Sequence, residues 1–311
     1  MTAKKDITTD ENAARAYFEG IRWPNGPFCP HCGSTDKVYR LEGKSHRPGL
    51  FHCNACAGQF TVTTGSVMES SHIPLNKWAF GFRLYAASKK GFSAHQLHRM
   101  IGITYKSAWF MAHRIREAMD EPKTELMGGS GKTVETDETF IGGLEKNRHN
   151  IKRKRMGTGQ SGKETVAALV ERGGKVRSFH IGEVTQKNLR TALKGHIHKD
   201  SRIVSDNAVT SLWVEREFGN HHTVSHKHKE YVRGDIHTNT IEGYFSILKR
   251  GILGTYHHVS PQHLHRYLSE FDFRYSNRAS IGVEDSERMT RVVKGAEGKR
   301  LYYRQDDKAQ V

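Results

Sequence analysis

The sequence contains no long apolar run, and this absence limits the kinds of protein it can encode. No stretch of its 311 residues approaches the roughly 18 consecutive apolar residues that signal a membrane-spanning helix. The first residues, MTAKKDITTDENAARAYF, also contain no apolar segment of the kind found in a signal peptide. We therefore expect neither a membrane span nor secretion, and we expect a cytoplasmic protein.

Acidic residues are scarce relative to basic ones. Lys and Arg number 49 against 33 Asp and Glu, which gives a formal net charge of +16. Such an excess favours a polyanionic partner, and nucleic acid is the commonest. A basic protein that is merely soluble would carry the same charge, so the motifs must decide between the two.

Cysteine is rare, and all of it falls in two CxxC units, CPHC and CNAC, separated by 20 residues. In a chain without a secretion signal, this pattern predicts a metal site rather than disulfides. Four thiolates complete a tetrahedron around a structural Zn²⁺ and leave no open position for water. The expected ligands are Cys29, Cys32, Cys53 and Cys56. The adjacent His31 and His52 are alternatives for one of the four.

Turn-rich and polar stretches divide the chain into five segments. We expect a helical lead, a zinc ribbon, a helical DNA-binding domain, an α/β domain and a polar C-terminal tail. Their bounds are 1–25, 26–66, 72–121, 131–280 and 281–311. The tail is highly charged, and we expect it to be a frayed helix or disordered, without a function.

The helical segment has the pattern of a helix-turn-helix. Ser93 is a good N-cap for the helix AHQLHRM, and Gly102-Ile103-Thr104 then makes a short turn into a longer helix. Apolar residues on that longer helix repeat at positions 108, 111, 112, 115 and 119, which predicts one buried stripe. The residues expected to contact DNA from its other faces are Lys106, Ser107, His113 and Arg114. A plain three-helix bundle with a structural role is the alternative.

The α/β segment begins with the strand-like run TVETDETFI, which carries several acids. Alternation places Glu135 and Asp137 on one face and Glu138 on the other. Carboxylates are costly to bury in a strand unless they are paired or bound to metal. A hairpin around Gly173-Gly174 and a helix follow, and a short buried strand then ends at Asp206.

A later helix, HTNTIEGYFSILKR, carries a third acid. Its apolar residues form a buried stripe, and Glu242 and Lys249 lie about 20° apart on the rim of that stripe, because each residue advances by about 100°. A capping box between Asn239 and Glu242 is an alternative role for this acid. Three strands, a helix, a strand with Asp206 and a later helix with Glu242 make the plan of an RNase H-like fold, whose converging carboxylates suit Mg²⁺.

Several motifs together resemble the DDE transposases of bacterial insertion sequences, in the zinc-ribbon group related to eukaryotic Merlin elements. The resemblance runs from about residue 11 to residue 278 and rests on RWPNGPFCPHCGS, VETDETFIGG, SDNA, HTNTIEGYFSILKRGILGTYHHVSP and FRYSNR. It implies that Asp137, Asp206 and Glu242 form a catalytic triad that holds two Mg²⁺ or Mn²⁺ ions. It also implies that Lys249 positions DNA near the active site. Asn239 is an alternative third ligand, because this group varies at that position.

The resemblance implies a homo-oligomer, associated with the nucleoid, that binds the terminal inverted repeats of its element and target DNA. Hydrolysis would expose a 3′-OH, which then attacks the target strand. The basic residues expected to neutralise phosphates are Lys152, Arg153, Lys154, Arg155 and Arg250, although the run 152–155 also fits a solvated loop. Two alternatives share these motifs: a DNA-binding regulator without catalysis, and a metal-dependent nuclease that does not transfer strands.

Overall fold

A computed structural model describes most of the chain. The residues described are 6–143, 149, 151, 162–182, 184–206, 211–225, 228 and 230–301. The chain forms two compact units: unit 1 comprises residues 1–88, 92–120 and 283–311, and unit 2 comprises residues 89–91 and 121–282. Within the described residues, no helix combines the length and apolar character needed to cross a membrane.

Unit 1 begins with helix α1 (Glu11–Arg22), whose N-cap Asp10 accepts a 2.8 Å hydrogen bond from the amide of Ala13. A small antiparallel sheet follows, in the order β1-β2-β3. Its strands are β1 (Val38–Arg40), β2 (Phe51–Cys53) and β3 (Gln59–Phe60). Trp23, Phe51 and Phe60 pack their rings together as its core, with centroids 5.1–5.9 Å apart.

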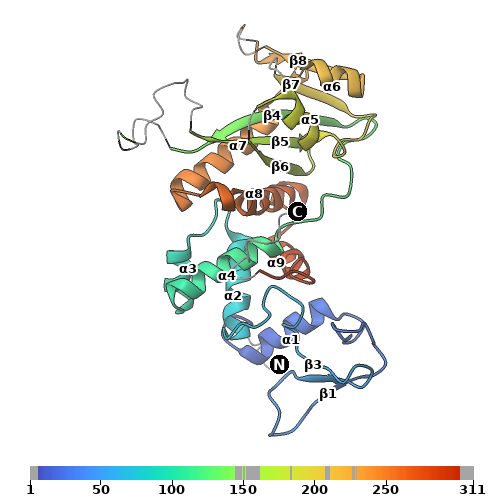
Figure 1. Cartoon of the computed structure of the whole chain (residues 1–311), viewed down its shortest axis with the longest axis vertical. Helices are drawn as coiled ribbons and strands as arrows, with labels where there is room; N and C mark the ends of the chain where they lie inside the picture. The colour runs from blue at the N-terminus through green and yellow to red at the C-terminus, as the bar shows by residue number, and fades with distance from the viewer. Residues whose placement is uncertain are drawn as a thin grey trace. The chain divides into compact units, whose positions relative to one another are not determined.

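Three helices continue unit 1, and the sequence anticipates each of them (Figure 1). They are α2 (Leu75–Ala87), α3 (Ala94–Ile101) and α4 (Tyr105–Ala118). Ser93 caps α3 by accepting from the amide of Gln96, as the sequence predicts. Gly102 ends α3 with φ 67°, a left-handed conformation that glycine adopts without steric cost. The predicted stripe of α4 is confirmed, since all five of its residues are buried.

The C-terminal segment of unit 1 differs from the expectation of a frayed or disordered tail. Residues Asp285–Lys294 form helix α9, whose Met289, Val292 and Val293 are buried at helical spacing. Beyond it, the amide of Val67 donates to the carbonyl of Ala296. A helix was one of the two forms expected, but this helix is packed and not frayed, because three apolar residues in a charged segment suffice to make one buried helix face.

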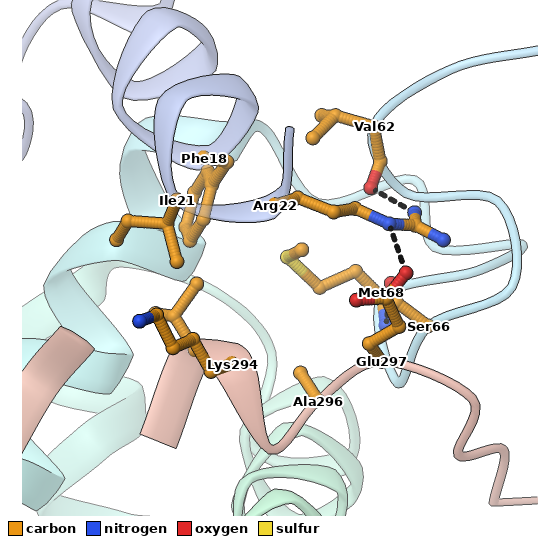
Figure 2. Close-up of a pocket in the computed structure, with 10 residues that line it drawn as sticks. Phe18, Ile21, Arg22, Val62, Ser66, Met68, Lys294, Ala296 and Glu297 are labelled. Atoms are coloured by element: carbon orange, nitrogen blue, oxygen red, sulfur yellow. Dashed lines mark hydrogen bonds and ion pairs between the residues drawn. The ribbon is translucent and has the colours of Figure 1, made fainter. Parts of the chain in front are cut away.

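Arg22 joins α1 to this C-terminal segment (Figure 2). Its guanidinium donates to the carbonyls of Val62 and Thr64 at 2.7 and 2.6 Å and pairs with Glu297 at 3.3 Å. The cavity beside it, about 30 Å³, has room for one or two water molecules. The last helix is therefore built into the same core as the first.

Unit 2 is built on a five-stranded sheet in the order β6-β5-β4-β7-β8. The strands are β4 (Thr133–Ile141), β5 (Glu164–Glu171), β6 (Val176–Ile181), β7 (Arg202–Asp206) and β8 (His221–Val224). The first three form an antiparallel meander, while β7 lies parallel to β4 and β8 lies parallel to β7. Two short strands, β9 (Val232–Arg233) and β10 (Ile236–His237), pair separately.

Helices cover both faces of this sheet (Figure 1). They are α5 (Gln186–Leu193), α6 (Ser211–Phe218), α7 (Asn239–Gly251), the π-helical turn η4 (Ile252–Tyr256) and α8 (Pro261–Ser276), before the turn η5 (Ala279–Ile281). On one face α7 and α8 pack on Val166, Ala168 and Val170. On the other, α6 packs on Val134 and Leu169.

Candidate active site and metal centre

Asp137 and Asp206 stand beside each other on parallel strands. In the register of β4 and β7, Thr136 pairs with Ser205, so the next residue of each strand is an aspartate. Asp137 also pairs with Ala168, a residue of the core beneath α7 and α8. Asp137 therefore belongs to the sheet face that these two helices cover, and Glu242 comes from the first turn of α7.

The charges of Asp206 and Glu242 both act on Asp137. The pKa of Asp137 is raised from 3.8 to about 7, first by burial, then by the charge of Asp206 and also by that of Glu242. The amide of Glu138, which donates to Asp137 Oδ1 at 2.8 Å, and the charge of Lys249 oppose this rise. Three carboxylates crowded in this way form an oxygen-rich donor set that suits a hard divalent cation such as Mg²⁺.

The acids are less tightly gathered than the cysteines. In the described part of the chain, the four thiols are the one group of three or more metal-ligand side chains whose donor atoms all lie within 4.8 Å of one another. The acidic set is thus open, with Asp137 half-buried and Glu242 exposed. It fits an ion that also accepts water and substrate oxygens, as Mg²⁺ usually does.

Glu138 lies on the opposite strand face, as the alternation predicts. Burial, and after it the charges of Asp137 and Asp206, raise its pKa to about 8. Its Oε1 is buried and has no hydrogen-bond partner. This unpaired oxygen costs folding free energy, since a buried acceptor normally finds a donor.

The start of α7 decides against the capping-box alternative. The N-cap is Thr238, one residue before the position expected, and its side chain makes no capping hydrogen bond. Thr238 instead donates its hydroxyl to Glu242 Oε1 at 3.1 Å. Asn239 is the exposed first residue of the helix. It lies nearly one turn before Glu242 and thus on the same side, so it stays an alternative ligand.

Lys249 and Arg250 follow Glu242 on the same helix, and both side chains are exposed. Lys249 comes seven residues after Glu242, which places the two on one side of α7. Its effect on the pKa of Asp137 shows that its charge is felt at the acidic site. Arg250 donates through Nε to the carbonyl of Ser246 at 3.1 Å.

A buried network that the sequence analysis missed holds the middle of α7. Asp272 accepts from the amide and hydroxyl of Ser178, both at 2.7 Å, and from the hydroxyl of Tyr244 at 2.6 Å. Burial raises the pKa of this aspartate. Its one signal in the sequence is an acid between two aromatic residues, FDF, which is too common to identify a partner.

The four cysteines are positioned to bind zinc. The Sγ atoms of Cys29 and Cys56 are 3.6 Å apart, and so are those of Cys32 and Cys53. A ZnS₄ tetrahedron with bonds of about 2.3 Å requires sulfur separations of about 3.8 Å, so the donor set fits the ion. Neither His31 nor His52 belongs to this group. The predicted four-thiolate site is therefore the one that the fold assembles.

Two of the residues expected to face DNA are buried instead. His113 is 1% exposed and packs against Trp109, while Arg114 is 7% exposed and donates to the carbonyl of Glu69 at 2.9 Å. The prediction was wrong because contacts from outside the two helices, such as that of Arg114 with Glu69, bury this part of α4. Lys106 is exposed and Ser107 is half-buried. The basic run 152–155 lies outside the described residues.

Comparison with known proteins relates both the acidic set and the cysteine site to transposases. The ISXO2-like transposase domain family matches residues 126–276, and the transposase zinc-ribbon domain family matches residues 9–59. A protein of Halobacterium salinarum, described as an uncharacterized protein in transposable element ISH50, is 28% identical over 285 residues. This alignment covers 88% of the chain and 93% of that protein.

The two matched domains define a transposase that carries an N-terminal zinc ribbon. Residues 126–276 thus belong to a DDE transposase domain family of insertion sequences, and residues 9–59 to a transposase zinc-ribbon family. The resemblance drawn from its motifs is thereby confirmed at the level of the family.

Proposed function

We propose that the chain cleaves and joins DNA strands with a catalytic triad of Asp137, Asp206 and Glu242. The observation that carries this proposal is the placement of the half-buried Asp137, whose pKa is raised to about 7 by burial first and then by the charges of Asp206 and Glu242. The order of the sheet, a three-stranded antiparallel meander followed by two parallel strands, supports an RNase H-like fold. Each acid lies on a different element, β4, β7 or α7.

In this proposal the triad binds two Mg²⁺ or Mn²⁺ ions through carboxylate oxygens. Such ions supply activation of water or of a 3′-OH and stabilisation of the leaving oxygen at phosphorus. Asp137, desolvated and next to Asp206, favours a bound cation because that charge offsets the repulsion between the acids. Lys249 places a positive charge beside the site and neutralises a phosphate of the bound strand.

We also propose that unit 1 recognises DNA. Helices α3 and α4 with the Gly102 turn fit a helix-turn-helix, in which the exposed Lys106 and the adjacent Ser107 face the duplex. Arg250 and residues 152–155 are further phosphate contacts. The partners are the terminal inverted repeats and target DNA. The protein works as a homo-oligomer on DNA, in the bacterial cytoplasm next to the nucleoid.

The test is to incubate the zinc-loaded protein with the ends of its element and Mg²⁺ or Mn²⁺, and to follow strand cleavage and joining. We expect both products from the wild type and neither from Asp137→Asn or Glu242→Gln, with DNA-end binding retained. Cleavage without joining would indicate a nuclease instead. DNA binding without either product would indicate the non-catalytic regulator.

A further inference from the structure

Glu135, two residues before Asp137 on β4, has a carboxylate that accepts three hydrogen bonds. The residue is 0% exposed. Its Oε1 accepts from Arg172 Nε at 2.6 Å and from the hydroxyl of Thr240 at 2.8 Å. Its Oε2 accepts from the amide of Ile241 at 2.9 Å. Because both oxygens accept from donors of its own unit and the side chain is fully buried, we assign Glu135 to this network and not to the metal ligands.

This carboxylate supplies the cap that α7 lacks. The first amides of a helix have no partner within it, and an N-cap side chain usually accepts from the second or third of them. The N-cap Thr238 makes no such bond. Ile241, the third residue of the helix, instead donates to Glu135 of the neighbouring strand. A negative charge at this end of a helix is also favoured by the helix dipole.

Arg172, the residue after β5, links Glu135 to the segment that precedes α7. Its guanidinium pairs with Glu135 and donates to the carbonyls of Asp235 and His237, each at 2.8 Å. One side chain therefore fixes the buried carboxylate and also the two residues that lead into the helix. A planar guanidinium carries five donors in a fixed fork and can hold these acceptors in defined directions, whereas the three donors of a lysine radiate from a single nitrogen.

From these contacts we infer that Glu135 and Arg172 are positioning residues that set Glu242 relative to Asp137. The inference rests on the proposed function, in which those two acids share the metal site. Glu135 is two residues from Asp137 on the same strand face, and its contact Ile241 directly precedes Glu242 in the chain. This carboxylate is thus a short, buried link between the elements that carry the two acids.

An ion pair that only stabilises the fold would be buried in the same way as Glu135 and Arg172. A second buried Glu–Arg pair in this unit serves as a control for that effect. Glu270 of α8 is 0% exposed and pairs with Arg274 at 2.5 Å, while the hydroxyl of Tyr256 donates to it. Glu270→Gln removes a comparable buried charge in the same unit without touching the start of α7. Loss of stability alone should therefore be similar in Glu135→Gln and Glu270→Gln.

The experiment compares zinc-loaded wild type, Glu135→Gln and Glu270→Gln in three measurements. These are hydrogen exchange of a peptide covering residues 236–245, Mn²⁺ binding by electron paramagnetic resonance, and single-turnover cleavage of element ends at saturating Mn²⁺. For Glu135→Gln we expect faster exchange in that peptide, weaker Mn²⁺ binding and cleavage slowed roughly 10-fold or more, since small displacements of catalytic groups have such effects. DNA-end affinity should stay within about 2-fold.

Glu270→Gln should leave all three measurements close to wild type per folded molecule. Wild-type exchange, Mn²⁺ binding and cleavage in Glu135→Gln would overturn the positioning role and leave the proposed function standing. Equal losses in both variants would also overturn it, by reducing the role to stability. A wild type that neither binds Mn²⁺ beyond its zinc site nor cleaves would contradict the proposed function and the inference together.

Discussion

Asparagine at position 137 should stabilise the metal-free protein, and increasingly so as the pH rises. The carboxyl of Asp137 has a pKa of about 7 in the folded chain against 3.8 for the unperturbed group. Below pH 3.8 it is neutral in both states and costs nothing. Between pH 3.8 and 7 the unfolded chain releases the proton and the folded chain keeps it, so folding becomes less favourable by about 1.4 kcal/mol per pH unit.

The full cost above pH 7 is therefore about 4 kcal/mol. Asp137→Asn removes this titration while it retains an oxygen that accepts from the amide of Glu138. The advantage of the variant over wild type should grow by about 2–3 kcal/mol between pH 5 and pH 8. Saturating Mn²⁺ at pH 8 should stabilise the wild type, by about 2.7 kcal/mol at 100 times its dissociation constant, and leave the variant almost unchanged.

The assay is urea unfolding followed by pulsed hydrogen exchange of peptides from β5, which reports on unit 2 separately from unit 1. All buffers contain zinc at a fixed concentration, so that the ribbon stays loaded. A difference in unfolding free energy that is independent of pH would refute the reasoning, and so would equal stabilisation of both proteins by Mn²⁺.

Three further predictions concern the other sites. Cys56→Ser should abolish amide protection across residues 26–66 and leave the β5 peptides protected, because a ribbon of this size depends on its metal for folding; protection that survives would contradict a zinc-dependent fold. Glu242→Gln should slow strand cleavage by roughly 100-fold or more, while Asn239→Ala stays within about 5-fold, and the opposite ranking would assign the third ligand to Asn239. Lys249→Ala should reduce the salt dependence of binding to element ends by about one phosphate contact, and an unchanged slope would exclude this contact.

Local patterns in the sequence predicted most elements of both units. The hairpin around Gly173-Gly174, the cap at Ser93 and the stripe of α4 depend on neighbours within a few residues, and the structure has each of them. The errors come from distant contacts. Arg114 is buried and donates to the carbonyl of Glu69, 45 residues earlier, and nothing within α4 itself signals that partner.

The same distinction explains what could be predicted of the site. Alternation along TVETDETFI separated Asp137 from Glu138, and it also placed Glu135 on the face of Asp137. It could not show that Glu135 caps a helix more than 100 residues later, because the contact with Ile241 depends on how α7 packs on the sheet. The capping box between Asn239 and Glu242, the alternative role for this acid, is excluded by a contact of the same kind, since the cap comes from another element.

The central claim is that Asp137 and Asp206 are metal ligands in a strand-cleaving site. The most direct measurement replaces each in turn by cysteine and compares cleavage of element ends in Mg²⁺ and in Mn²⁺. A thiolate is a poor ligand for the hard Mg²⁺ and a better one for Mn²⁺. We predict that Asp137→Cys and Asp206→Cys are inactive in Mg²⁺ and recover measurable cleavage in Mn²⁺, whereas wild-type rates in Mg²⁺ would contradict the claim.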